Sequence, residues 1–266
     1  MMGDDRAVLF VGAGPGDPEL ITVKGQRALA GADVVIYAGS LVPEAVLKWA
    51  KPEAKTLNSA GMHLNEIVAE IRSGWEEKKR VVRLHTGDPS LYGAIFEQMM
   101  ALDRHGISYR IIPGVTAAFA AAAAMGIEYT LPEVSQTLIL TRMAGRTPVP
   151  EAEALEKLAA HGTSMAVYLS ISLIERVADI LADAYGPAAP VAVAYRVSQP
   201  DEKIRFTKVS DLVETVRTEN ITRQALIIVG KVLGPRVGEG GVEPSRLYDR
   251  HFSHGFRKAE SDSVND

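Results

Sequence analysis

The sequence predicts an α/β protein with two α/β domains, the first built on a mainly parallel sheet and the second on a mixed sheet. Three observations carry this prediction. Short β-branched runs alternate with helical patterns, glycine-rich turns follow the strands of the first half, and an alanine-rich segment separates two halves of different character. A chain of 266 residues can bury one large core or two smaller ones.

The first half shows the clearest alternation. Strands that alternate with helices form βαβ units, whose strands lie parallel in one sheet. The alanine-rich helix expected over 114–126 ends this half, so we expect a first domain of residues 1–125. The predicted strands are 7–11, 34–37, 80–84 and 109–113, and the predicted helices lie near 22–30, 43–50, 64–73 and 92–105.

The second half, residues 126–234, is expected to form the other domain. The turn-forming residues Ser198–Asp201 join two of its strands, which indicates an antiparallel hairpin and therefore a mixed sheet. The predicted strands are 136–142, 164–170, 190–197, 202–209 and 224–232, and the predicted helices lie near 150–160, 172–185 and 210–217.

A polar extension, residues 235–266, follows the second domain. It contains His251 and His254, whose spacing would allow a metal contact. Two histidines without a further ligand make a weak metal site, so we expect a solvated or dimer-packing tail.

Composition excludes several classes of protein. The formal net charge of −4 leaves no basic excess to neutralise a phosphate backbone, so no nucleic-acid partner is expected. The absence of cysteine excludes disulfides, thiolate metal sites and a thiol nucleophile, and no metal site is predicted. The N-terminus begins acidic with a short apolar run, which indicates neither signal peptide nor membrane anchor, and we expect a cytoplasmic protein with no membrane partner.

The first glycine-rich loop, GAGPGDP, covers residues 12–18 between a strand and a helix. A dinucleotide site requires G-x-G-x-x-G and an acidic residue at the end of the second strand. Here Pro15 interrupts the glycine spacing, and Asp33 precedes the strand 34–37. These departures argue against NAD, and a tight turn without a ligand is the alternative for this loop alone.

Two further loops follow the strands of the same predicted sheet. TGDPSLYG covers 86–93, and a third turn over 112–119 offers the hydroxyl of Thr116 and the backbone amide of Ala117. Ligands of open α/β sheets bind outside the carboxyl ends of the strands, so these loops together predict a pocket. Taken alone, Asp88 could simply cap the helix that follows it.

These segments, in this order, resemble the tetrapyrrole methylase family. The resemblance covers about residues 7–233, and it is closest to the members that methylate carbon 11 of precorrin-4 in cobalamin synthesis. It is carried by VGAGPGDPELITVKG, ADVVIYAGSLV, VVRLHTGDPSLYGAI, PGVTA, LPEVSQTLILTR, GRTPVPE, MAVYLS and AYRVSQPDEKI.

The resemblance implies the class III methyltransferase fold, with an active site in the cleft between two α/β domains. It also implies a tetrapyrrole substrate, a homodimer, and S-adenosyl-L-methionine as methyl donor, with S-adenosyl-L-homocysteine as product. Most donor contacts would use backbone groups. The implied donor-binding positions are Pro15, Gly87, Asp88, Leu91, Thr116, Ala117, Leu169, Val197, Gln224 and Ala225.

The implied chemistry is in-line displacement, for which orientation of the reacting carbon and the methyl group is the main task. Relatives that act on an earlier precursor carry an acid and a lysine where this chain has Ala38, Gly39 and Asn58, so those assignments do not transfer. We therefore assign proton movement to His63 or Asp88, both in or beside the loops. The cations expected to meet the tetrapyrrole carboxylates are Arg142, Arg146 and Arg196, with Arg83 and Lys203 as further candidates.

Other functions remain open at this point. The same reaction on the cobalt-loaded precursor, or methylation of another tetrapyrrole position, fits the same motifs. Within the superfamily, a ribosomal-RNA 2′-O-methyltransferase or a diphthine synthase is the nearest rival. An NAD-dependent oxidoreductase and a non-catalytic ligand-binding module are rivals from other classes.

Overall fold

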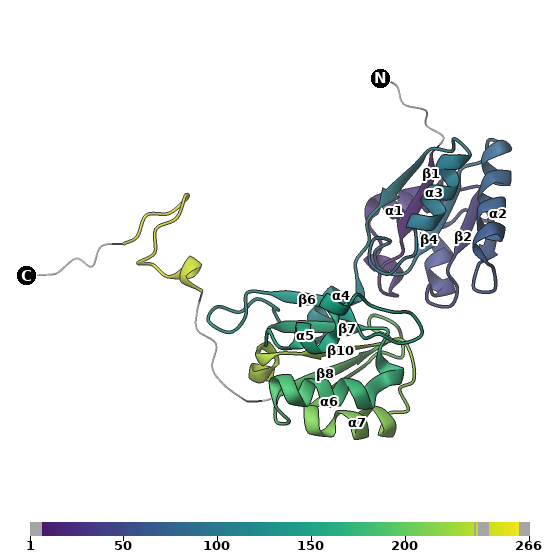
Figure 1. Ribbon diagram of the computed structural model, residues 1–266. Helices are drawn as coiled ribbons and strands as arrows, with labels where there is room; N and C mark the ends of the chain where they lie inside the picture. Colours follow the sequence, from purple (N-terminus) through teal and green to yellow (C-terminus); the bar gives the residue numbers. More distant parts are fainter. Residues whose placement is uncertain (1–6, 237, 239–244, 261–266) are drawn as a thin grey trace, which may run out of the picture. The chain divides into compact units, whose positions relative to one another are not determined.

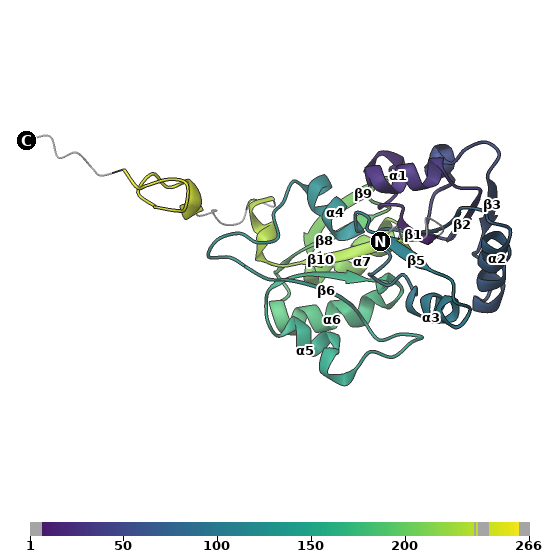
Figure 2. The ribbon, with the colours of Figure 1, turned by 90° about the horizontal axis from the view of Figure 1, so that it is seen from above.

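The computed structural model describes residues 7–236, 238 and 245–260. The chain divides into two compact units. The first consists of Met1–Ala124 with Arg196–Lys203, and the second of Met125–Tyr195 with Ile204–Asp266. Each unit contains one five-stranded sheet with helices packed against it (Figure 1 and Figure 2), which confirms the predicted two α/β domains.

The sheet of the first unit is parallel in every strand pair. Its order is β3-β2-β4-β1-β5, with β1 (Val8–Gly12), β2 (Val34–Tyr37), β3 (Lys55–Asn58), β4 (Val81–His85) and β5 (Tyr109–Ile112). The central strands β2 and β4 are fully buried, as is typical of parallel strands covered on both faces. All five carboxyl ends therefore lie at one edge of the sheet.

Helices cover both faces of this sheet. On one face, α1 (Val23–Ala30) and the 3₁₀ helix η2 (Glu44–Trp49) contribute Leu29 and Val46 to a buried core. On the other face, α2 (Leu64–Glu76) and α3 (Phe96–Arg104) contribute Ile71 and Leu102 to a second core. A short 3₁₀ helix, η1 (Pro18–Leu20), follows the first glycine loop, and α4 (Ala117–Met125) follows the third.

The sequence prediction misses β3 and begins α3 too early. Only one residue of β3, Leu57, is strongly apolar, and the strand is largely exposed at the sheet edge, so no hydrophobic pattern reveals it. The helix expected near 92–105 begins at Phe96 because Tyr92 and Ala94 have left-handed φ angles of 56° and 47°. The helix expected near 43–50 is present as the 3₁₀ helix η2.

The sheet of the second unit is mixed. Its order is β6-β7-β10-β8-β9, with β6 parallel to β7 and β10 antiparallel to both β7 and β8. The strands are β6 (Leu138–Arg142), β7 (Ser164–Tyr168), β8 (Pro190–Tyr195), β9 (Lys203–Lys208) and β10 (Ala225–Val229). Neighbouring strands β8 and β9 are joined by the short connection 196–202, and a parallel pair would need a much longer crossover, so the predicted hairpin is present.

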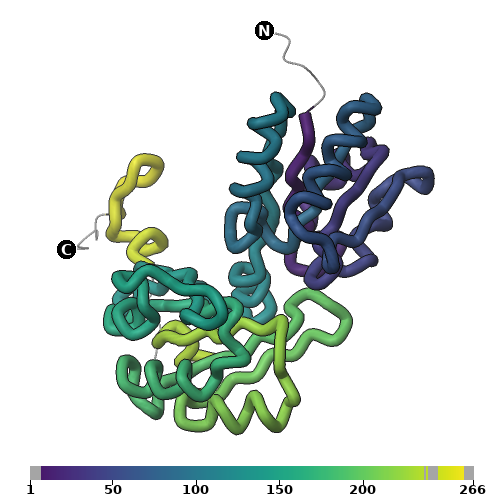
Figure 3. Tube along the Cα trace, turned by 45° about the vertical axis from the view of Figure 1, so that its right-hand side comes forward, coloured from purple at the N-terminus to yellow at the C-terminus, as the bar shows by residue number. Residues whose placement is uncertain are grey.

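Helices α5 (Leu155–Ala159), α6 (Ile174–Tyr185) and α7 (Leu212–Thr218) of the second unit contribute to one large core with its sheet. Val177 and Leu181 of α6 and Leu212 of α7 are buried there together with Leu155 of α5. Figure 3 traces the chain of this unit in green shades. The 3₁₀ helices are η3 (Glu151–Glu153), η4 (Ile171–Leu173), η5 (Val209–Asp211), η6 (Lys231–Arg236) and η7 (Arg246–Tyr248).

Within the described part of the chain, no helix has the length and apolar character required to cross a bilayer.

Candidate functional site

Three loops meet at the carboxyl edge of the parallel sheet in the first unit. The loops after β1 and β4 are joined backbone to backbone, since the N–H of Gly87 donates to the carbonyl of Gly14 over 2.8 Å and the N–H of Gly14 donates to the carbonyl of Gly87 over 3.3 Å. The N–H of Ala13 also donates to the carbonyl of His85 over 2.7 Å. The pocket-forming loops of the sequence prediction are therefore neighbours.

Glycine is required where these loops touch. A Cβ atom on Gly12 would lie 2.6 Å from the Cα of Gly114, and one on Gly114 would lie 2.1 Å from the carbonyl oxygen of Gly87. Both distances are far below van der Waals contact, so only glycine permits this approach. Gly87 differs, because a Cβ there would meet nothing closer than 3.7 Å. Its left-handed φ of 58° is what favours glycine at that position.

Asp88 ties the second loop to the third. One carboxylate oxygen accepts hydrogen bonds from the N–H and the hydroxyl of Ser90, and the other accepts from the N–H of Gly114 over 2.9 Å. Burial alone would raise the pKa of Asp88, but the hydrogen bonds from Ser90 and Gly114 outweigh it and hold the pKa below its ordinary value. Asp88 is therefore a carboxylate at neutral pH, with both oxygens engaged.

The remaining predicted donor-binding positions of the first unit lie on or beside these loops. Pro15 is buried in the first loop, and the N–H of Leu91 donates to the carbonyl of Asp88 over 3.2 Å. Thr116 is buried, and its carbonyl accepts the N–H of Phe119 at the start of α4, whose first residue is Ala117.

A segment distant in sequence belongs to the same unit and contacts the first loop. Residues 196–202, which join β8 to β9, are here called the hairpin tip. The Ser198 hydroxyl accepts the N–H of Asp17 over 3.0 Å, and the Gln199 amide donates to the carbonyl of Pro15 over 3.5 Å. Val197, another predicted donor-binding residue, is buried in this tip. The sequence places these strands next to each other but does not indicate what their connection touches.

His85 is a buried residue of the site that the sequence analysis does not single out. It ends β4 directly before the second loop, is 3% exposed, and stacks on Phe10 with ring centroids 5.9 Å apart. Its Nε2 has no hydrogen-bond partner among the residues that the structure describes. Burial, assisted by the charge of Arg83, lowers the pKa of His85 to about 3, so the ring is neutral at pH 7.

His63 lies in a different setting from Asp88. It precedes α2 after β3, is exposed, and its backbone N–H donates to the Glu66 carboxylate over 2.9 Å. Strand β2 lies between β3 and β4 in the sheet, so the loops that carry His63 and Asp88 are not adjacent. The two predicted catalytic residues share the sheet edge, and no hydrogen bond or ion pair joins them among the described residues.

The other predicted donor-binding residues share one edge of the mixed sheet in the second unit. Leu169 follows β7, and Gln224 and Ala225 lie at the start of the antiparallel β10, where Ala225 pairs with Tyr195 at the end of β8. Leu169 and Gln224 both have a left-handed φ of 53°, and Leu169 is 63% exposed. Strained non-glycine residues gather at functional sites more often than elsewhere, so this edge of the sheet is a candidate site.

Two of the predicted substrate-binding arginines are engaged within the chain. The guanidinium of Arg142 donates to the carbonyls of Thr147 and Pro148 and so holds its own loop. Arg196 donates to Gln199 and pairs with Asp201 in the hairpin tip. Arg146 lies exposed in the loop that Arg142 holds.

Arg83 is not available to a ligand at the surface. It is 5% exposed, and it donates to the side chain of Gln98 and to the carbonyl of Ile36. Its inward position follows from its place in a fully buried strand.

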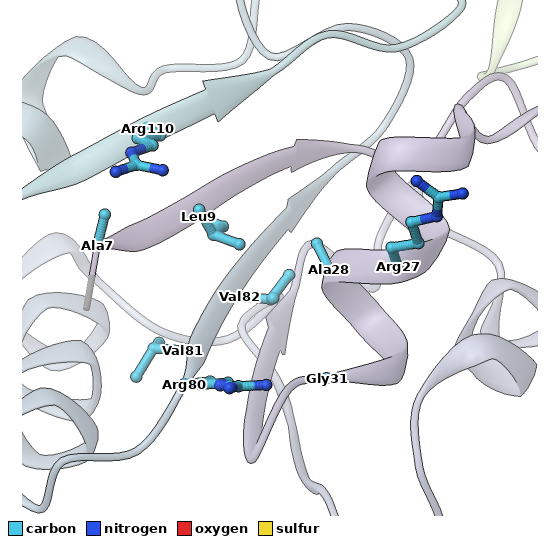
Figure 4. Close-up of a pocket in the computed structure, with 9 residues that line it drawn as sticks. All are labelled: Ala7, Leu9, Arg27, Ala28, Gly31, Arg80, Val81, Val82 and Arg110. Atoms are coloured by element: carbon cyan, nitrogen blue, oxygen red, sulfur yellow. The ribbon is translucent and has the colours of Figure 1, made fainter. Parts of the chain in front are cut away.

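A cavity of about 250 Å³ lies at the other edge of the same parallel sheet. Ala7, Val81 and Arg110 line it from the amino ends of β1, β4 and β5, whereas the glycine loops follow the carboxyl ends. Figure 4 shows Arg27, Arg80 and Arg110 around an apolar centre. Among the described residues, the lining contains three arginines and no acidic residue, which disfavours a positively charged methyl donor in this cavity.

Comparison with known proteins identifies the family. The model of the tetrapyrrole (corrin/porphyrin) methylases matches residues 7–213. The cobalt-precorrin-4 C(11)-methyltransferase of Methanocaldococcus jannaschii is 50% identical, over 97% of this chain and 98% of that protein. The precorrin-4 C(11)-methyltransferase of Pseudomonas aeruginosa is 46% identical, over 95% of this chain and 99% of that protein.

Two solved structures support the same assignment. A cobalt precorrin-4 methyltransferase has a TM-score of 0.83 at 49% identity, covering 86% of this chain and 96% of that one. The uroporphyrin-III C-methyltransferase of Thermus thermophilus, complexed with S-adenosyl homocysteine, has a TM-score of 0.72 at 28% identity, covering 90% of this chain and 97% of that one. The chain therefore belongs to the tetrapyrrole (corrin/porphyrin) methylase family.

Proposed function

We propose that this protein transfers a methyl group from S-adenosyl-L-methionine to carbon 11 of precorrin-4, with or without central cobalt, in cobalamin biosynthesis. The single observation that carries this assignment is the near-full-length identity of 50% and 46% to C(11)-methyltransferases of these two substrates. The glycine loops of the first unit supply backbone groups that can hold such a methyl donor.

The first unit suits a donor that is held through backbone groups. Its three loops lie at the carboxyl edge of a parallel sheet, where ligands of such sheets bind. A Cβ on Gly87 would meet nothing closer than 3.7 Å, so no neighbour crowds the backbone at this position. A relative complexed with S-adenosyl homocysteine has the same fold. We assign Pro15, Gly87, Asp88, Leu91, Thr116, Ala117, Leu169, Val197, Gln224 and Ala225 to donor binding.

The protein's own part in the reaction is orientation. When bound, S-adenosyl-L-methionine supplies an activated methyl group on a sulfonium that leaves as a neutral thioether. The mutual hydrogen bonds of Gly14 and Gly87, together with the Asp88 tie to Gly114, fix the loops that hold the donor. Holding two reactants in near-attack geometry is worth about 7–11 kcal/mol. The loops therefore need no strongly basic side chain to give most of the rate enhancement.

Ligand titration and turnover test this function. We expect the protein to bind S-adenosyl-L-homocysteine but not NAD in calorimetric titration, and to add one methyl group at carbon 11 of at least one of the two precursors. Mass spectrometry and NMR of each product identify the substrate and the methylated position. Binding of NAD alone, or no turnover of either precursor despite donor binding, would refute the proposal.

Substitution of Asp88 and His63 separates positioning from proton transfer. Asp88→Asn keeps the shape but removes the charge and one acceptor oxygen, so the tie to Ser90 and Gly114 weakens. We expect the donor dissociation constant to rise by about tenfold, since hydrogen bonds to charged groups are worth about 1.5–3 kcal/mol.

If Asp88 or His63 moves a proton, Asp88→Asn or His63→Ala also lowers kcat at saturating donor. Unchanged kcat in both variants removes them from the chemistry and leaves Asp88 as a positioning residue.

Arg142 and Arg146 are our candidates for the tetrapyrrole carboxylates, whereas Arg196, the third predicted cation, is engaged with Gln199 and Asp201. Arg146 is the one with an exposed side chain in a loop that Arg142 holds in place.

We also propose a homodimer in the cytoplasm. Exposed Phe96 and Met100 on α3 and Ile111 on β5 support self-association, because apolar side chains of this size gather at interfaces. Analytical ultracentrifugation that gives a monomer at micromolar concentration would contradict the dimer.

A further inference from the structure

The hairpin tip holds an unusual backbone conformation. Arg196 and Ser198 have left-handed φ angles of 44° and 65°, and neither is glycine. Each such residue costs about 1–3 kcal/mol unless the surroundings hold it in place. Here the N–H of Ser198 donates to the Glu202 carboxylate over 2.6 Å, and its hydroxyl accepts the N–H of Asp17 over 3.0 Å. The strain is therefore held by two contacts, one within the tip and one on the first glycine loop.

A chain of polar contacts runs through Gln199 to that loop. Arg196 pairs with Asp201 over 3.0 Å and donates two hydrogen bonds, of 3.0 and 2.8 Å, to the amide oxygen of Gln199. These bonds determine which side of the amide is oxygen, so the NH₂ group is directed to the carbonyl of Pro15, 3.5 Å away. The guanidinium thus orients the amide that contacts the loop.

The same side chain also fits the loop sterically. A Cβ atom on Gly16 would lie 2.3 Å from the Cγ of Gln199, so the side chain occupies the space that glycine leaves free. Pro15 and Gly16 are both buried, although they belong to a loop. Gln199 is polar and lies outside the hydrophobic core clusters, so it contributes to the loop rather than to the cores.

We propose that Gln199 is a positioning residue that fixes the first glycine loop in the conformation that binds the methyl donor, and that Arg196 acts through it. This inference rests on the proposed function of the loop in donor binding. When a loop also samples other conformations, its apparent affinity for the ligand is the affinity of the competent conformation multiplied by the fraction of molecules in that conformation. Gln199 therefore governs donor affinity and has no direct role in tetrapyrrole binding.

The test compares donor and tetrapyrrole constants in Gln199→Ala. We expect the dissociation constant for S-adenosyl-L-homocysteine and the donor KM to rise about tenfold. A change of this size corresponds to the loss of one hydrogen bond and of the order that it gives to the first glycine loop. The tetrapyrrole KM and kcat at saturating donor should stay within twofold of wild type. Gln136→Ala is the matched control, because its amide donates to a backbone carbonyl, that of Thr130, in the second unit. It should leave all of these constants unchanged.

Arg196→Met distinguishes the inference from a direct role of Arg196 in substrate binding. If Arg196 orients Gln199, this variant raises the donor KM, and the double variant with Gln199→Ala is no worse than either single one. If Arg196 instead binds a tetrapyrrole carboxylate, the tetrapyrrole KM rises and the donor constants do not, which overturns its part in the inference. Donor binding by Gln199→Ala within twofold of wild type overturns the role of Gln199. Failure of the wild-type protein to bind S-adenosyl-L-homocysteine would instead refute the proposed function itself.

Unchanged stability of Gln199→Ala would exclude a general loss of folding. Both tryptophans of the chain, Trp49 and Trp75, belong to the first unit, so their fluorescence in urea follows the unit that contains the loops. We expect its unfolding midpoint to match that of wild type while donor binding falls. A large loss of stability together with equal losses of donor and tetrapyrrole affinity would overturn the inference.

Discussion

Gly114→Ala should abolish measurable donor binding and destabilise the first unit by about 3 kcal/mol, the upper part of the usual range for overpacking. The new Cβ would lie 2.1 Å from the carbonyl oxygen of Gly87 and 2.8 Å from the Cα of Gly12. Both obstacles are backbone atoms, so no side-chain rotation relieves the contact. The third loop must then move away from the other two and take with it the N–H that binds Asp88. Calorimetric titration with S-adenosyl-L-homocysteine and tryptophan fluorescence in urea measure the two effects.

Gly61→Ala is the matched control for this substitution. Gly61 lies in the loop after β3, at the same edge of the sheet, and a Cβ there would meet nothing within 4 Å. We expect this variant to bind the donor as wild type does and to unfold at the same urea concentration. Wild-type donor affinity in Gly114→Ala would show that the three loops are free to separate, and would contradict the close-packed site described above.

Acid should destabilise the first unit well before its carboxylates are protonated, because His85 is held neutral in the folded state. Its pKa is about 3 when folded and about 6.5 when unfolded. Between these values, the unfolded chain binds a proton that the folded chain does not, so stability falls as pH falls through 6.5 and continues to fall towards 3. The contribution of His85 amounts to a loss of about 2 kcal/mol between pH 7 and pH 5.

His85→Phe removes this loss. Phenylalanine keeps a ring to stack on Phe10 and removes both the titrating group and the buried Nε2 without a partner. His85→Leu is a smaller second variant, should the larger ring overpack the site. Urea titrations that follow tryptophan fluorescence at pH 7 and pH 5 should show a wild-type loss about 2 kcal/mol larger than the loss in either variant. Equal losses in all three proteins would mean that His85 is protonated or exposed in the folded state.

The sequence predicts most of the fold because buried strands carry its strongest patterns. Strands such as β2 and β10 are continuous apolar runs, and their positions follow from that pattern alone. Strand β3 has no such pattern, since it is held by backbone pairing to β2 at the sheet edge. The start of α3 is equally invisible, because the left-handed residues Tyr92 and Ala94 are not types that favour that conformation.

The site is predictable only to the level of its loops. Glycines after successive strands indicate where backbones approach, and parallel topology brings those loops to one edge. Which side chains are already engaged depends on contacts across distant parts of the chain. Arg196 and Arg83 look like free cations in the sequence, yet one holds Gln199 and the other lies inside a buried strand. His85 gives no signal of its own, because the largest cause of its lowered pKa is burial, which depends on residues far from it in sequence.

The contact between Gly16 and Gln199 also limits how such enzymes can be recombined. Residues 15–17 and 196–202 are separated by about 180 positions but belong to one structural unit. Their fit depends on the missing Cβ of Gly16 and on the amide side chain of Gln199. A chimera that takes its first half from one relative and its second half from another divides this pair. Its parent sequences must agree at both positions, and homologues that differ at one of them should differ at the other as well.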